Sequence, residues 1–254
     1  YMTVGESGAG ISTLWLFRNP NEMRASTDPT NYAGISGITY IGEADNDLLN
    51  PEWHGSSIYM PKEDGVYYFT SSGYVSNALP EYKQQRAGNN FKVVFAAWNE
   101  VSYSAAKGLY HWTSSGITRI DPFRFPHAEN PGVPSAGVYY DDYAYANFLR
   151  TDGTTVLCKC KREALTNGIE WGWHPILSLG ANACAFLFIS ELDTGLPKLW
   201  MGKGTTVGYI LLSNDPVNAT GYQFTTEDSY FITPWYSNSF VEQLKLLDQL
   251  VSRC

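Results

Sequence analysis

The chain has 254 residues, 44% of them apolar and 17% charged, which is within the range of globular proteins. Its formal net charge of -8 argues against a nucleic-acid partner, because such binding depends on clustered Lys and Arg. No apolar run approaches the roughly 20 residues of a membrane-spanning helix, so we expect no membrane insertion. Aromatic residues make up 15% of the chain, and 23 Gly and 13 Pro are spread along it. This mixture favours short strands and tight turns.

An internal repeat is the most informative feature of the sequence. Residues 65–73 (GVYYFTSSG) and 108–116 (GLYHWTSSG) are identical at six of nine positions. Each copy predicts an aromatic strand, a Ser-Ser-Gly turn and a second strand, which together make a β-hairpin. A hairpin alone cannot bury its apolar face, so the recurrence is typical of stacked or radial sheets of about four strands, as in propellers.

Three weaker copies extend the repeat, each an apolar strand that enters a turn, at residues 14–17, 148–150 and 199–201. With the two strong copies, turns recur near residues 21, 73, 116, 153 and 204. We therefore predict an all-β fold, a β-propeller of about five blades, with six as the alternative. Short apolar runs between the hairpins are interpreted as inner strands buried from both sides. These runs are residues 57–60, 91–98, 137–145 and 183–190.

The domain organisation follows from the extent of the repeat. Residues 121–134 are rich in Pro, and we interpret them as a long loop between strands because copies of the repeat flank them. We predict that residues 1–236 form the propeller. Residues 240–250 fit helical spacing but also tolerate a strand. We predict that residues 237–254 are a C-terminal extension that leads into a further element, and that the numbering begins inside a longer or processed polypeptide.

The hairpin motif Gly-aliphatic-Tyr-x-aromatic-Thr-Ser-Ser-Gly resembles the blades of propeller domains in structural proteins of tailed bacteriophages. The segment 229–236 (SYFITPWY), running on to the Lys-Leu-Leu at 245–247, resembles the exit from such a propeller into a following β domain. The resemblance covers most of the chain loosely and three short segments closely. Similar hairpins occur in kelch-type, lectin and glycosidase propellers, and the chain lacks the Trp-Asp dipeptide and the Ser-x-Asp-x-Gly-x-x-Trp box that would select among them.

The resemblance implies a non-enzymatic structural or adhesive component of a phage virion, in the neck, the tail or the capsid. Such a propeller would serve as an assembly platform and contact host-surface glycan. Its expected location is the virion, an extracellular particle, and its expected partners are other virion proteins, copies of itself and host-surface carbohydrate. The alternative function is an extracellular propeller that binds or hydrolyses glycans. The resemblance carries no catalytic residues over to this chain.

Carboxylates are the residues to weigh for the enzymatic alternative, because a glycoside hydrolase needs two of them on either side of the bond that it breaks. Each candidate lies in or near a predicted turn, where Asp commonly bonds the local backbone. We therefore predict no catalytic residues and no enzyme, with a glycoside hydrolase as the only enzymatic alternative. The candidates are Asp45 or Asp47, Asp141 or Asp142, and Glu191 or Asp193.

Metal ligation is not indicated by the spacing of the possible ligands. Cys158, Cys160, Cys184 and His174 match no zinc signature, and Asp45 to Asp47 lacks the rest of a calcium loop. Cys158 and Cys160 are two residues apart, which places both on one face of a strand. The other histidines stand apart from one another. We predict no metal and no cofactor; the remaining histidines are His54, His111 and His127.

Aromatic side chains are the best candidates for ligand binding, since exposed Trp or Tyr at blade loops can stack on sugar rings. The competing interpretation is that large aromatic residues on strands seal the interfaces between blades. The exposure of each ring decides between the two. The candidate ligand-binding residues are Trp53, Trp98, Trp112, Trp171 and Trp173.

Overall fold

The computed structural model divides into two units, Tyr1–Asp215 and Pro216–Cys254. The second unit lies outside the described residues, and with it the predicted boundary at 236, the extension 237–254 and the segment 229–236. The candidates His127 and Asp193 and the residue Cys254 also lie outside them. The described residues are 2–7, 11–26, 37–54, 57–69, 75–85, 87–106, 108–123, 131–165, 168–182, 184–191 and 195–213.

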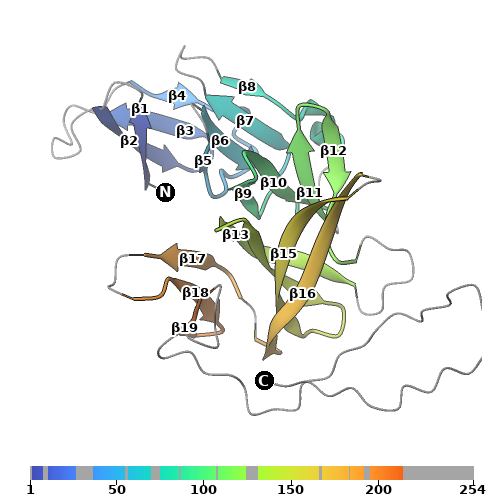
Figure 1. Cartoon of the computed structure of the whole chain (residues 1–254). Helices are drawn as coiled ribbons and strands as arrows, with labels where there is room; N and C mark the ends of the chain where they lie inside the picture. The colour runs from blue at the N-terminus through green and yellow to red at the C-terminus, as the bar shows by residue number, and fades with distance from the viewer. Residues whose placement is uncertain are drawn as a thin grey trace, which may run out of the picture. The chain divides into compact units, whose positions relative to one another are not determined.

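Five antiparallel sheets make up the described chain, and we name them A to E in chain order (Figure 1). In each sheet every strand pairs with the next strand along the chain, so each sheet is a meander. Sheet A holds β1 (Met2–Ser7), β2 (Ile11–Arg18), β3 (Glu22–Ser26) and β4 (Thr39–Tyr40). Sheet B holds β5 (Glu52–His54), β6 (Ser57–Lys62), β7 (Gly65–Phe69) and β8 (Val75–Asn77).

The next two sheets also have four strands, and the last has three. Sheet C holds β9 (Val94–Ala97), β10 (Glu100–Ala105), β11 (Gly108–Thr113) and β12 (Gly116–Arg119). Sheet D holds β13 (Gly132–Tyr140), β14 (Tyr143–Arg150), β15 (Thr155–Leu165) and β16 (Gly168–Gly180). Sheet E holds β17 (Leu187–Ser190), β18 (Lys198–Lys203) and β19 (Thr206–Leu211). The one short helix in the described part is the 3₁₀ turn η2 (Pro80–Lys83), and no helix there could span a membrane.

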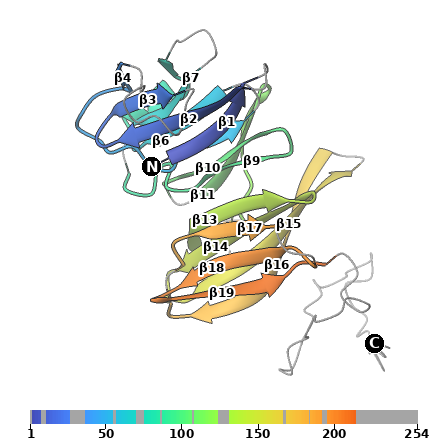
Figure 2. The same ribbon diagram turned by 90° about the vertical axis from the view of Figure 1, so that its left-hand side faces the viewer.

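Apolar clusters join each sheet to the next one in the chain. One cluster lies between sheets A and B, one between B and C, one between C and D, and one between D and E. The first strands of sheets B to E also contact one another in succession (Figures 1 and 2). Successive meanders stacked in this way are the blades of a β-propeller. The predicted all-β propeller of about five blades is confirmed.

The two strong copies of the repeat occupy equivalent places in the fold. They form β7 and β11, the third strands of sheets B and C, and each pairs with the fourth strand in a hairpin. In the second hairpin the Thr113 hydroxyl donates to the Gly116 carbonyl at 3.1 Å and accepts from the Ser115 amide at 3.2 Å. The weaker copies lie instead in second strands, β2, β14 and β18. The counted turns are therefore not all equivalent, which explains their uneven spacing.

The prediction of inner strands is correct for two of the four apolar runs. Residues 91–98 and 183–190 contain β9 and β17, which are first strands of their sheets. Residues 57–60 belong instead to a second strand, β6, and residues 137–145 cover the end of β13 and the start of β14. The prediction was wrong there because first and second strands are both buried on two faces, so both give continuous apolar runs.

Candidate functional site

Two of the five candidate tryptophans meet between sheets C and D. The rings of Trp98 and Trp171 lie edge to face with centroids 4.9 Å apart, and both pack against the ring of His111. Tyr139 adds a fourth ring 5.2 Å from Trp98, and the Arg162 guanidinium lies 5.7 Å from the centre of the Trp171 ring. Trp171 is buried and Trp98 half-buried. These rings therefore seal a blade interface and offer little surface to a ligand.

The turn that carries Trp98 has an unusual backbone. Trp98 and Asn99 form a two-residue hairpin loop with φ of 49° and 65°, a region that a bulky residue such as Trp seldom adopts. The Trp98 Nε1 donates to the Asp142 carbonyl, 3.3 Å away in the corresponding turn of sheet D. One blade earlier, the His54 Nε2 lies 2.8 Å from the Asn99 carbonyl. In both cases a ring nitrogen of one blade lies within hydrogen-bond distance of a carbonyl in the corresponding turn of the next blade.

Ser102, His111 and Glu100 form an arrangement with the residue types of a hydrolase triad. The Ser102 Oγ lies 3.0 Å from the His111 Nδ1, and the Glu100 Oε2 lies 3.1 Å from the Nε2. Ser102 is 0% exposed and His111 1% exposed, so no substrate reaches the hydroxyl. Burial lowers the pKa of His111, Glu100 opposes that shift and Arg162 reinforces it. Within the interface between sheets C and D, the Ser102 hydroxyl and the His111 Nδ1 satisfy each other, whereas the Glu100 Oε2 and the His111 Nε2 lie within ion-pair distance without hydrogen-bond geometry.

The other three candidate tryptophans also pack against neighbouring strands. Trp53 is half-buried against the cluster between sheets A and B. Trp112 lies edge to face with Tyr59 of sheet B, with ring centroids 6.1 Å apart. Trp173 donates its indole N–H to the Ile120 carbonyl. None of the five candidates is among the exposed residues, and the interpretation as sealing residues fits their positions.

The candidate carboxylates lie in separate parts of the chain. Asp45 and Asp47 belong to the loop between sheets A and B, residues 141–142 form the β13–β14 turn, and Glu191 follows β17. None of these residues lines the apolar pocket between sheets D and E that is described below. The described carboxylates are thus not gathered at that pocket as a glycosidic bond would require.

A buried lysine, Lys62, places its positive charge near Asp45 and Asp47, the carboxylates considered above as calcium ligands. Lys62 is 0% exposed, and its Nζ donates to the carbonyls of Ile41 at 3.2 Å and Glu43 at 2.5 Å. Burial lowers the pKa of Lys62, and the nearby carboxylates, Asp64 first, act in the opposite direction. Within the described ranges, no group of three or more His, Cys, Asp or Glu is arranged to hold a metal ion.

The cysteines divide between two interfaces. Cys158 and Cys160 are buried on the face of β15 that packs against sheet C, so the prediction that they share one face is confirmed. Cys184 lies on the other side of sheet D, where the Asn147 amide contacts its sulfur. Burial raises the pKa of Cys158 to about 12. None of these three cysteines is in a disulfide bond, and His174 is exposed, so these residues are not gathered into one site.

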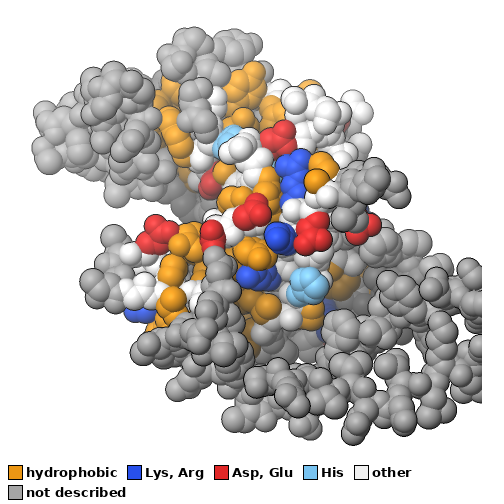
Figure 3. All heavy atoms as spheres, viewed as in Figure 1, with side chains coloured by type: hydrophobic (Ala, Val, Ile, Leu, Met, Phe, Trp, Pro, Cys, Tyr) orange, Lys and Arg blue, Asp and Glu red, His pale blue; other side chains and the backbone are white. Residues whose placement is uncertain are grey.

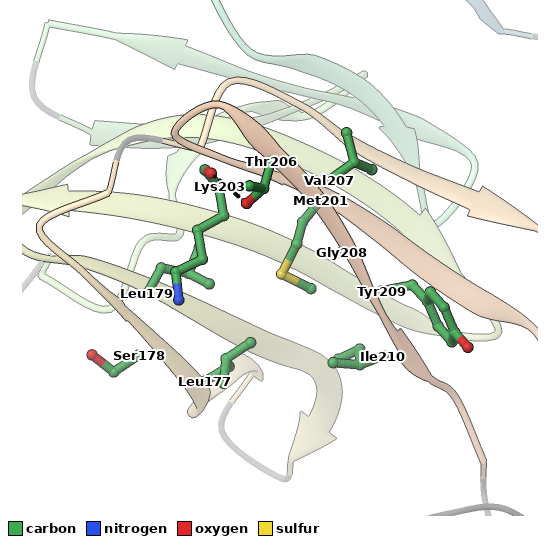
Figure 4. A pocket seen from close by; sticks show the side chains of 10 residues that line it. All are labelled: Leu177, Ser178, Leu179, Met201, Lys203, Thr206, Val207, Gly208, Tyr209 and Ile210. Carbon is green, nitrogen blue, oxygen red and sulfur yellow. Dashed lines mark hydrogen bonds between the residues drawn. The ribbon is translucent and has the colours of Figure 1, made fainter.

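A small apolar pocket lies between the last strand of sheet D and sheet E (Figure 4). Its volume is about 180 Å³, which is below the range of common small-molecule sites. Apolar side chains form most of its wall, and Lys203 and Ser178 lie at its edge. The pocket has room for one apolar side chain. Its other lining residues are Leu177, Leu179, Met201, Thr206, Gly208 and Ile210, together with Val207 and Tyr209, whose side chains the register of β19 assigns to the opposite face of sheet E.

The two faces of sheet E differ in what covers them. The inner face packs on sheet D through the side chains of Leu187, Leu199 and Met201 and their neighbours. The strand register places nine residues on the opposite face, in three rows that cross β17, β18 and β19. We call these nine residues the outer face of sheet E. The rows are Ser190–Lys198–Leu211, Phe188–Trp200–Tyr209 and Phe186–Gly202–Val207.

The outer face of sheet E is apolar and accessible. Phe186, Phe188, Val207 and Tyr209 are 42%, 58%, 63% and 51% exposed. Figure 3 shows hydrophobic side chains over the part of the molecule where β17 to β19 lie. The centroids of the Trp200 and Tyr209 rings are 4.8 Å apart, and Phe188 is the register partner of Trp200, so the middle row consists of three aromatic residues, two of them in ring contact. This face is the largest group of exposed apolar side chains in the described part of the chain.

Sequence reasoning missed these residues, although a signal for them exists. Residues 199–202 and 207–211 are apolar at successive positions and not only at alternate ones. Such runs indicate strands with two apolar faces. The local pattern does not show which of the two faces lacks a neighbouring sheet.

Comparisons with known proteins support the fold and leave the function open. No family model matches the chain, and no curated protein matches it. Among solved structures, the chain is similar to the extracellular domain of a one-component system of B. thetaiotaomicron, with a TM-score of 0.51 and 13% identity over 81% of this chain. It is also similar to BBS1N in complex with ARL6DN, with a TM-score of 0.50 and 11% identity over 82% of this chain.

The chain spans 26% and 63% of the lengths of those two proteins. A third structure, a PL25 ulvan lyase, has a TM-score of 0.46 and 13% identity over 84% of this chain and 64% of its own. At these identities the likeness shows the fold alone. None of the three is named as a phage protein. The class that fold and comparisons define is a β-propeller domain.

Proposed function

We propose that this chain is a non-catalytic β-propeller module that acts as a docking platform, with the outer face of sheet E as its contact surface. The observation that carries the proposal is the exposure of Phe186, Phe188, Val207 and Tyr209 on this one face. They are four of the ten exposed large hydrophobic residues in the described part of the chain. Contiguous apolar surface of this kind marks interaction sites on soluble proteins.

A protein partner suits this face better than a sugar does. Sugar sites combine aromatic rings with several polar groups that fix the orientation of the ligand. The polar side-chain groups of the outer face of sheet E are those of Ser190 and Lys198, the Tyr209 hydroxyl and the Trp200 indole N–H, which are few for a sugar site. The second candidate, a glycan platform, is favoured by one observation: the adjacent rings of Trp200 and Tyr209, with the Lys198 amine 5.2 Å from the centre of the Tyr209 ring.

The narrower proposal is that the platform belongs to a tailed-phage virion and lies outside the host cell, with other virion proteins as partners. Its only support is the resemblance of residues 65–73 and 108–116 to virion propeller hairpins. Mass spectrometry of purified particles tests it, because a structural part is present at a fixed ratio to the major capsid protein. Particles that lack the chain would exclude this narrower assignment and leave the docking platform untouched.

Binding of the fluorescent dye 8-anilinonaphthalene-1-sulfonate (ANS) to the full chain tests the docking surface. The double variant Phe188→Ser/Tyr209→Ser removes two large apolar groups from the outer face of sheet E. The matched control is Ile117→Ser/Ile169→Ser, which removes apolar groups of similar exposure elsewhere. We expect bound-dye emission to fall several-fold in the first variant only. Both variants should melt close to the wild type, because surface changes cost within about 0.5 kcal/mol.

Two results would count against the docking surface. Unchanged dye emission in the Phe188→Ser/Tyr209→Ser variant would mean that the face is not accessible in solution. A large loss of stability in that variant alone would mean that the two side chains belong to the core. A glycan array run in parallel, with retention lost on Trp200→Ser, would instead favour the second candidate.

A further inference from the structure

We infer that the outer face of sheet E binds the same face of a second copy of this chain, so that two molecules form a symmetric dimer through stacked sheets. The inference rests on the proposed docking function and names the partner. It is carried by the way in which sheets stack in this molecule, by the charge on the available faces and by the arrangement of the nine residues.

The stacking of the sheets indicates what kind of surface fits the face. Sheets B, C and D are each covered by apolar contacts with a sheet on both sides. Sheet E has two apolar faces as well, but within the described residues only its inner face is joined to a sheet by an apolar cluster. The surface that would pack on the outer face of sheet E in the same way is therefore another antiparallel sheet with an apolar face, about 10 Å away.

Charge decides which sheet of a second molecule can supply that face. The outer face of sheet A carries Arg18, Glu22 and Arg24, whose ion-pair distances are 3.8 and 4.0 Å. Burying these charges against an apolar surface would cost more than it returns. The outer face of sheet E holds a single charged residue, Lys198, among its nine positions. It is thus complementary to itself, as a two-fold symmetric interface requires.

The rows of residues then select the direction of the two-fold axis. An axis parallel to β18 would place Lys198 opposite its own copy, where like charges repel. An axis across the strands, along the row Phe188–Trp200–Tyr209, exchanges the other two rows. Lys198 then lies opposite Gly202, which has no side chain and is covered by the Phe186 ring. The second axis places each residue of the aromatic row opposite its own copy and separates the two lysines.

The exposed area predicts a weak dimer. An aromatic side chain buries about 150 to 250 Å² when it is fully covered. With the exposed fractions of Phe186, Phe188, Tyr209 and Val207, the face offers roughly 400 Å² per molecule, or about 800 Å² in total, which is below the range of stable complexes. Each copy carries a net charge of -8, so screening by added salt should favour association. We expect a dissociation constant in the micromolar range or weaker.

Sedimentation velocity of the full chain over a wide range of concentrations tests dimer formation. We expect the weight-average sedimentation coefficient to rise toward that of a dimer for the wild type and for the control Ile117→Glu. For Phe188→Glu we expect it to stay at the monomer value. A wild type that remains monomeric while ANS still binds the outer face of sheet E would overturn the dimer and leave the docking platform intact. Growth beyond a dimer would also overturn the inference, because a closed two-fold contact cannot propagate.

Cross-linking tests the axis in a Cys254→Ser background, since the three other cysteines are buried. A short bis-maleimide should join two copies of Tyr209→Cys, which the axis across the strands places opposite each other. It should not join two copies of Lys198→Cys, which that axis separates. The reverse result would refute the stated axis.

Discussion

Replacing Trp98 by Ala and by Gly separates the two effects that meet at this residue, the packing of its ring and the strain of its backbone. Deleting a buried Trp side chain costs about 3 to 5 kcal/mol, so for the half-buried Trp98 we expect Trp98→Ala to cost about 2 to 3 kcal/mol. The loss includes the contacts with Trp171 and His111 and the hydrogen bond to Asp142. Urea unfolding followed by far-ultraviolet circular dichroism measures it.

The Gly variant adds a comparison that ring packing alone does not predict. At φ of 49° an Ala retains the backbone strain and a Gly does not, so Trp98→Gly should be more stable than Trp98→Ala by about 1 kcal/mol. At Trp112, within strand β11, the order should reverse, with Gly less stable than Ala by about 0.5 to 1 kcal/mol. The reasoning fails if Ala is the better residue at 98, or if Trp98→Ala costs less than about 1 kcal/mol.

Further predictions concern buried charge and close packing. Because burial lowers the pKa of His111 in the folded chain, His111 becomes protonated at a higher pH in the unfolded chain than in the folded one. The urea midpoint should therefore fall as the pH drops below about 6.5, and His111→Gln should flatten that dependence. Lys62→Met leaves buried carbonyls and a buried carboxylate without their cation and should cost about 3 to 5 kcal/mol, against about 0.5 or less for exposed Lys83→Met. Gly137→Ala places a methyl group 2.5 Å from the Phe95 ring and should cost about 1 to 3 kcal/mol in thermal unfolding, whereas Gly208→Ala meets nothing within 4 Å and should not.

The fold could be predicted because its evidence is local. The copies beginning at Gly65 and Gly108 occupy the same place in successive meanders, so equivalent environments selected similar residues. The assignment of individual strands within a blade was less accurate. The apolar pattern of residues 57–60 predicts an inner strand, but these residues form β6, because burial on both faces leaves the same apolar pattern on neighbouring strands.

The candidate site could not be found in the same way, since exposure depends on what lies across an interface. Trp171 and Trp200 both occupy strands with apolar neighbours, yet one packs between sheets C and D and the other lies on the outer face of sheet E. The positive φ of Trp98 was equally hidden, because Asn99 is the only residue of that turn with a known preference for this backbone region. Tertiary packing, which the sequence pattern does not show, decides which aromatic rings remain accessible.

The pairing of every strand with its neighbour in sequence bears on how the chain can be made. Each sheet is complete once a single contiguous stretch has left the ribosome, and the surface that it then presents is the one against which the following stretch can condense. Contacts of short sequence separation favour rapid folding. Synthesis and folding of the described strands can therefore advance together, blade after blade, because the backbone partners of each of these strands lie next to it in the sequence.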